Sequence, residues 1–171
     1  MTTTLLSYLR LIIFTGGLLA GIQLPAYVDQ YGKSLQAHYL EAELALDEFR
    51  DEARKFFGGD LDRLIAHYHQ SNDKVFNEGG NSIEAVRNRT LLLQQSLHDF
   101  KSSAFNAYKL TFLTPVADIQ QEVRQNFSHT ITLQPQVIVF GLCSGLLLAV
   151  FCELLFKGVF ALFRKILPAQ T

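Results

Sequence analysis

Two apolar runs near opposite ends of this 171-residue chain constrain its fold more than any other feature. Residues 5–24 carry one charge, Arg10, and residues 137–156 carry one, Glu153. A helix of twenty residues is about 30 Å long, which matches the hydrocarbon core of a bilayer. The intervening residues, 25–136, hold eleven basic and fifteen acidic side chains. We therefore predict an all-α membrane protein with two transmembrane helices flanking an extramembrane domain.

Two other interpretations of the apolar runs stay open. The first run also fits a secretory signal peptide. However, neither possible cleavage site, near Ala20 or near Ala26, has small residues at both of the positions that cleavage requires. Either run also fits the buried core helix of a soluble protein, but a domain this small seldom hides two of them. The overall composition, 49% hydrophobic and 18% charged, favours the membrane interpretation.

The basic residues beside the runs predict the orientation. Arg10 lies early in the first run, and Lys157, Arg164 and Lys165 lie at or after the end of the second. By the positive-inside rule both termini are cytoplasmic, which places the middle segment in the periplasm of a bacterium. The predicted divisions are residues 1–24, a tail and first span; 25–136, the periplasmic domain; 137–157, the second span; and 158–171, a basic cytoplasmic tail.

The middle segment has helical periodicity close to 3.5 residues per turn, which is typical of a coiled-coil seam. Pro25 can kink the chain as it leaves the first run. From residue 28 the less polar positions predict a long helix to Phe56. Its predicted seam includes Leu35, Ala53 and Phe56, whereas Leu46 lies off the seam. Gly58 and Gly59 end this helix, and Asp60 caps a short helix over residues 61–70.

A second long helix is predicted from its cap at Ser82 through residue 114, where Pro115 stops it. Residues 78–81 before it are expected to form a turn. The two long helices are expected to pair as an antiparallel, coiled-coil-like hairpin. An amphipathic segment over residues 116–129 could pack at the base of the hairpin, which we favour, or lie in the membrane interface.

Small residues repeat every four positions in both apolar runs. Gly17 and Gly21 form one such face, and Gly141, Gly145 and Ala149 form another. Small faces of this kind let membrane helices approach closely. Some apolar side chains of the middle segment also lie off the predicted seams, where a hairpin alone leaves them in water: Tyr39, Leu46, Leu92, Phe105 and Phe112. These features favour homo-oligomers or a protein partner.

Glu153 is the ionisable residue inside the second run, and Lys157 follows it by one helical turn. Such a carboxylate could carry protons or line a pore. Because Glu153 lies only about four residues from the end of the run, a pair with Lys157 near the interface is the favoured interpretation.

The remaining titratable residues fit no familiar catalytic or metal site. His67 and His69 are two residues apart and so point to different sides of a helix. His38, in the seam, could sense pH, but a hydrogen-bonded structural role is favoured. No nucleophile motif is present, and a net charge of −1 argues against nucleic-acid binding. We expect no metal, no cofactor and no enzymatic activity.

One juxtamembrane motif carries a resemblance. Residues 21–32, GIQLPAYVDQYG, followed by His38, Glu41 and Ala42, resemble an uncharacterised family of small bacterial inner-membrane proteins. That resemblance implies two spans around a helical periplasmic segment. It assigns no activity, so it implies no catalytic or binding residues.

Three functions remain open, and we favour the first. It is a non-enzymatic membrane scaffold or partner-binding subunit that self-assembles through its periplasmic helices. The second is an ion channel or pore lined by the second span. The third is a periplasmic sensory module, which would need a separate output partner because its cytoplasmic tail is short.

Overall fold

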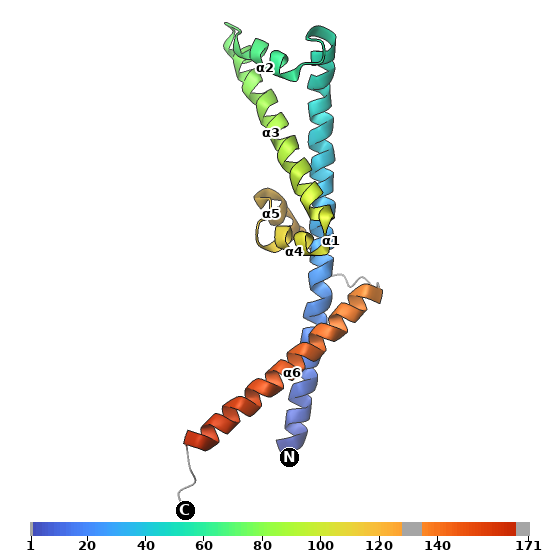
Figure 1. Cartoon of the computed structure of the whole chain (residues 1–171), viewed down its shortest axis with the longest axis vertical. Helices are drawn as coiled ribbons and strands as arrows, with labels where there is room; N and C mark the ends of the chain where they lie inside the picture. The colour runs from blue at the N-terminus through green and yellow to red at the C-terminus, as the bar shows by residue number, and fades with distance from the viewer. Residues whose placement is uncertain (1, 128–134, 167–171) are drawn as a thin grey trace, which may run out of the picture. The chain divides into compact units, whose positions relative to one another are not determined.

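The computed structural model describes residues 2–127 and 135–166, and every element in these ranges is a helix (Figure 1). The six helices are α1 (Thr2–Phe56), α2 (Leu61–His69), α3 (Lys74–Ser102), α4 (Ala104–Phe112), α5 (Ala117–Asn126) and α6 (Pro135–Ile166). The predicted all-α class is confirmed. The chain divides into two compact units, unit 1 (Met1–Tyr27 and Ser128–Thr171) and unit 2 (Val28–Phe127).

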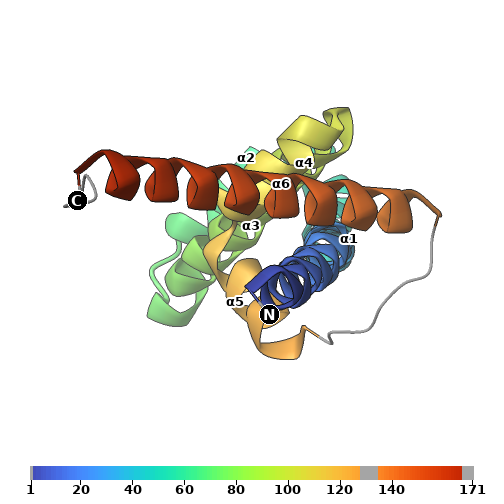
Figure 2. The same ribbon diagram turned by 90° about the horizontal axis from the view of Figure 1, so that it is seen from below.

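Unit 1 contains the first part of α1 and all of α6. The most apolar window of α1, from Ser7 onward, has a mean hydropathy of 1.7, and that of α6 has 2.4. Only 22% of each window is buried, whereas a core helix of a soluble protein is mostly buried. By length and composition, both helices are long and apolar enough to cross a membrane. Figure 2, which looks from below, shows α6 passing across α1.

Pro25 lies inside α1, which continues on both sides of it. The sequence analysis allowed a kink at this position because proline removes one backbone hydrogen bond. The helix nevertheless runs unbroken from Thr2 to Phe56, so the apolar segment and the first helix of unit 2 are one element.

The end of α1 and the start of α2 follow the prediction. Gly58 and Gly59 have φ values of +65° and +88°, the left-handed region that glycine adopts without a Cβ penalty. Asp60 then caps α2, its carboxylate accepting a hydrogen bond from the backbone N of Arg63 at 3.1 Å.

The start of α3 differs from the prediction. The helix begins at Lys74, capped by Asp73, and it runs through the glycines that were expected to form a turn before Ser82. A Cβ on Gly80 would lie 2.9 Å from the ring of His69 in α2. Because these glycines let α2 pack directly against α3, tertiary contact offsets their poor helix propensity.

The predicted second long helix is also interrupted. Ser103 adopts an extended conformation, with φ −162° and ψ 158°, and separates α3 from α4. Its hydroxyl accepts a hydrogen bond from the backbone N of Asn106 at 3.1 Å, and Ser102 donates to the carbonyl oxygen of Asp99 at 2.6 Å. Paired serines offer the backbone these local partners in place of helix bonds, so the continuous helix to residue 114 was wrong.

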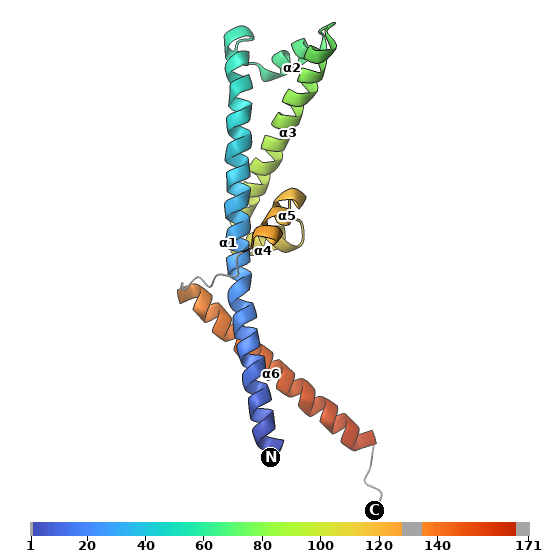
Figure 3. The same cartoon turned by 180° about the vertical axis from the view of Figure 1, so that it is seen from behind.

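Within unit 2, α1 and α3 pass each other in opposite directions. The rings of Tyr31 and Phe100 lie 6.0 Å apart, and Thr90 Oγ1 donates to the carbonyl oxygen of Ala42 at 3.1 Å. The core here is built from fully buried Leu35 of α1, Leu93 of α3, and Ile119 and Val123 of α5. Figures 1 and 3 show α4 and α5 gathered against α1 in this unit. The amphipathic segment predicted after residue 116 thus packs onto the other helices.

The seam of α1 is partly as predicted. Leu35 and Ala53 are fully buried, but Phe56 is 72% exposed and Leu46, expected off the seam, is 1% exposed. Leu35 and Leu46 are eleven residues apart. An eleven-residue spacing corresponds to about 3.67 residues per turn instead of 3.5, so the buried stripe drifts away from the heptad positions.

Candidate functional site

Glycines of α1 and α6 face each other in unit 1. A Cβ built on Gly17 would lie 3.0 Å from Gly145 Cα, and one on Gly145 would lie 2.9 Å from the carbonyl oxygen of Phe14. A Cβ on Gly141 would lie 2.5 Å from Cγ1 of Ile22. No side chain fits into such gaps, so the two backbones are in direct contact. This is the geometry that small residues provide where membrane helices cross.

The structure brings the residues of both small faces together within one chain. A Cβ on Gly21 would overlap the Ser144 hydroxyl and lie 3.2 Å from Gly141 Cα. Ala149, the last residue of the α6 face, is also buried. The sequence analysis linked these faces to assembly between copies, whereas here they pack α1 against α6.

Ser144 adds a polar contact to the crossing that the sequence analysis missed. Its hydroxyl lies 2.8 Å from the carbonyl oxygen of Gly17 and 3.1 Å from that of Gly141. Interhelical hydrogen bonds of this kind stabilise membrane helix pairs by up to about 1–2 kcal/mol. The sequence held one clue to this contact: Ser144 follows Gly141 by three residues, which places it on the helix face that carries the small residues.

Glu153 is the centre of a charged cluster. Its two carboxylate oxygens meet Arg10 Nη2 at 2.9 Å and Lys157 Nζ at 2.8 Å. The Glu153–Lys157 pair matches the favoured interpretation of the sequence, and Arg10 is a partner that was not foreseen. The carboxylate is one-third exposed and has a cation at each oxygen, so it is held as a structural ion pair.

In unit 2, Glu122 joins α5 to α1. Its carboxylate accepts a hydrogen bond from Ser34 Oγ at 2.8 Å and lies 2.5 Å from His38 Nε2. An ionised carboxylate only accepts, so the imidazole donates. His38 is thus a hydrogen-bonded residue that positions α5, with Glu41 3.9 Å from its other nitrogen.

Two carboxylates of α5 have lowered pKa values. The hydrogen bond from His38, assisted by Ser34, lowers the pKa of Glu122. Partial burial raises the pKa of Asp118, but hydrogen bonding and the charge of Arg89 outweigh it and leave the pKa below its ordinary value. Both groups therefore favour the docked position of α5 when they are ionised.

A shallow groove of about 370 Å³ lies beside His38, between α1 and α3. Its floor is mostly alanine and valine, and its polar edge includes Glu41 and Arg89. Arg89 is itself paired with Asp118. The groove has the size of a small-ligand site but holds few convergent polar groups that would fix a ligand's orientation.

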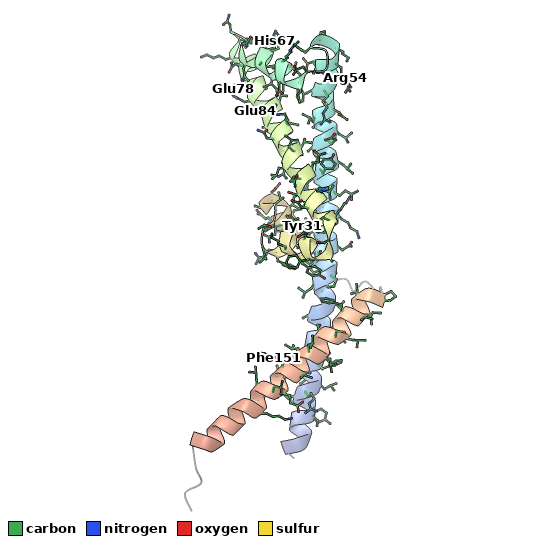
Figure 4. All side chains as sticks on the ribbon, viewed as in Figure 1. Tyr31, Arg54, His67, Glu78, Glu84 and Phe151 are labelled. Carbon is green, nitrogen blue, oxygen red and sulfur yellow. The ribbon has the colours of Figure 1, made fainter. Side chains whose placement is uncertain are left out.

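The described residues contain no cluster of three or more His, Cys, Asp or Glu side chains that could hold a metal ion. The His67 ring packs at a tilt against the Phe57 ring, with the centroids 5.3 Å apart, and His69 Nε2 lies 3.8 Å from a carboxylate oxygen of Glu84. Figure 4 shows His67 and Glu84 at the end of unit 2 that also carries Arg54, away from Tyr31. These histidines therefore have individual packing partners.

Comparison with known sequences and structures gives one match. The model of a family described as "Protein of unknown function (DUF2937)" matches residues 5–165, nearly the whole chain. No curated protein and no solved structure matches.

Proposed function

The chain belongs to the DUF2937 family of proteins of unknown function, and on that premise we propose that it is an integral membrane protein acting as a non-enzymatic scaffold. In this proposal α6 and the first part of α1 span the inner membrane of a bacterium. Unit 2 stands in the periplasm as a helical hairpin and binds a second copy of the chain.

The crossing of α1 and α6 supports the membrane assignment. Their glycine faces pack together as membrane helices do, while leucines such as Leu142 and Leu147 on α6 remain exposed as lipid-facing residues. Arg10, Glu153 and Lys157 form one cluster, so the basic ends of both helices lie together. That arrangement supports cytoplasmic termini on the same side of the membrane.

Site-specific labelling tests the orientation. In a variant whose two native cysteines are serine, a single cysteine at Phe56 should react with a membrane-impermeant maleimide in cells with a permeabilised outer membrane. A cysteine at Thr3 should react only after the inner membrane is lysed. Reaction of Thr3→Cys before lysis would place the N-terminus in the periplasm and reverse the proposed topology. If neither cysteine reacts even after lysis, the two positions are not exposed to water on either side of the membrane, which would contradict the proposal.

The observation that carries the scaffold proposal is the exposure of large apolar side chains on unit 2. Leu44 is 70% exposed and Leu40, one turn earlier on α1, is 51% exposed. On α3, Leu91 and Leu92 are 54% and 51% exposed. Leucines in water on an otherwise charged helical unit are typical of a protein contact surface.

Mass measurement in nanodiscs or mild detergent tests this surface. The wild-type chain should give a defined oligomer, and the double variant Leu40→Gln, Leu44→Gln should give a smaller species because its apolar contact is lost. The matched control is Asp47→Asn, an exposed substitution on the same helix that should leave the oligomer unchanged. A wild-type chain that is only monomeric would refute self-assembly.

The pore alternative has less support. A pore lined by α6 needs a free polar group, but the Glu153 carboxylate has Arg10 and Lys157 of its own chain at its two oxygens. We therefore expect no conductance from reconstituted vesicles. A conductance that Glu153→Gln alters would restore the pore proposal.

A further inference from the structure

The segment from α4 to the turn after it exposes an unusual concentration of apolar surface. Phe105 is 76% exposed, Phe112 43% and Leu113 75%, all within nine residues of one another. Leaving such side chains in water is unfavourable in proportion to the apolar area that they expose. A segment with this exposure is expected to have a contact partner.

This segment lies at the end of unit 2 where its first and last turns meet. Gln30 Nε2 donates to the carbonyl oxygen of Asn126 at 3.3 Å, so the first and last turns of unit 2 are neighbours. One residue further along α1, the Tyr31 hydroxyl accepts from the backbone N of Val116 at 3.0 Å, three residues after Leu113. Figure 4 shows Tyr31 beside α4 and α5.

Sequence spacing sets the height of this end above a membrane. The apolar run of α1 ends at residue 24, and Tyr31 follows seven residues later. At 1.5 Å per residue that is about 10 Å of helix, a few ångströms more than the roughly 5–8 Å thickness of one headgroup layer. In the proposed topology Tyr31 thus lies near the outer edge of the headgroup layer, where large side chains of the attached segment can reach into it.

The charge of the segment also distinguishes it from the rest of unit 2. Residues 101–117 contain two lysines, Lys101 and Lys109, and no acidic residue, although unit 2 holds fifteen acids in all. Both lysines are exposed. Lys101, at the end of α3, donates a hydrogen bond to Gln36 of α1 at 3.2 Å, whereas Lys109 belongs to α4 itself. A local cationic stretch in an acidic domain suits an anionic lipid surface.

We propose that α4 lies on the outer surface of the bilayer, with Phe105, Phe112 and Leu113 inserted into the interfacial layer and Lys109 facing anionic headgroups. Aromatic side chains are favoured in this layer, and short amphipathic helices bury their apolar faces about 5–10 Å into it. The inference rests on the proposed function, since it requires that α1 and α6 span the membrane.

Tryptophan fluorescence tests the contact directly, because the chain contains no tryptophan. We would compare Phe105→Trp with two matched variants of the full chain. Phe56→Trp is 72% exposed at the far end of unit 2, and Leu147→Trp is 70% exposed on α6. Each change exchanges one exposed apolar side chain for another, so the fold is retained. The vesicles contain anionic phosphatidylglycerol and lipids brominated either near the headgroup or deep in the acyl chain.

The expected result is emission from Phe105→Trp that is blue-shifted and quenched several-fold more by shallow bromine than emission from Phe56→Trp. Leu147→Trp should be quenched more by deep bromine. Quenching of Leu147→Trp with none at Phe105→Trp would overturn the surface contact and leave the spans intact. A blue shift at Phe105→Trp without quenching would also overturn it, because a protein surface then covers the residue. No quenching in any variant would refute the membrane assignment itself.

Discussion

Gly17 and Gly145 hold the backbones of α1 and α6 in contact: a Cβ on Gly17 would lie 3.0 Å from Gly145 Cα. Gly16, the adjacent residue, has nothing within 4 Å of such a Cβ. One position is thus closed to any side chain and its neighbour is open, although both are glycines in the same helix. This difference makes the crossing testable with neighbouring substitutions.

Gly17→Leu should separate α1 from α6 and destabilise unit 1 by about 1–3 kcal/mol, the usual range for overpacking a tight contact. Gly16→Leu should leave the stability of unit 1 nearly unchanged, because its side chain enters open space. Reversible unfolding in mixed micelles measures both variants. Equal losses for the two substitutions would contradict the crossing.

Ser144→Ala should cost about 1 kcal/mol, because it removes the hydroxyl that lies 2.8 Å from the carbonyl oxygen of Gly17. The control is Cys143→Ala, a similar change at the preceding residue, which is exposed. The same unfolding assay applies. If Ser144→Ala is as stable as the control, the hydrogen bond contributes nothing measurable.

Arg10→Glu should weaken the pairing of α1 with α6, because it places two carboxylates where Arg10 and Glu153 now pair at 2.9 Å. Adding Glu153→Arg should recover part of the loss by restoring opposite charges. Unfolding midpoints of the single and double variants give the comparison. Additive losses with no recovery would show that the pair does not form.

Glu122 should make the docking of α5 dependent on pH in the acid range. Hydrogen bonding to His38 and Ser34 lowers its pKa below the ordinary value of 4.5. A lowered pKa in the folded state contributes stability that is fully present above the ordinary value and is lost as the pH falls through the folded value. Hydrogen exchange in α5 should therefore accelerate as the pH falls below about 4.5, after correction for intrinsic exchange rates.

Glu122→Gln separates this effect from the other carboxylate of α5. Asp118, paired with Arg89, also has a lowered pKa and acts in the same direction. The Glu122→Gln variant should lose protection in α5 at neutral pH and show a smaller change on acidification. An unchanged profile would assign the whole effect to Asp118.

Tyr31→Phe should destabilise unit 2 by about 1 kcal/mol, because the backbone N of Val116 then loses the hydroxyl that accepts its hydrogen bond at 3.0 Å. Tyr39→Phe, at a half-buried tyrosine of the same helix, serves as the control. Thermal unfolding followed by circular dichroism measures both. Identical midpoints would contradict a contribution from the Tyr31 hydroxyl.

Features that depend on short stretches of the chain were predictable. Gly58 and Gly59 end α1, and Asp60 caps α2, because left-handed φ values and capping carboxylates are local properties of those residues. The small-residue face of α6 likewise follows from a four-residue spacing. The contact of Arg10 with Glu153 did not follow from spacing, because it depends on how two segments distant in sequence are aligned.

The sequence by itself determined the helical class, the two apolar helices and the helix ends that have strong local signals, such as the glycine stop after Phe56 and the Asp60 cap, because composition, periodicity and capping act within a few residues. Only the tertiary structure decided which faces those helices use. It buried Leu46, exposed Phe56 and carried α3 through Gly79 and Gly80. Each of these outcomes depends on packing between segments distant in sequence, whose free energy outweighs local preferences of about 1 kcal/mol per residue.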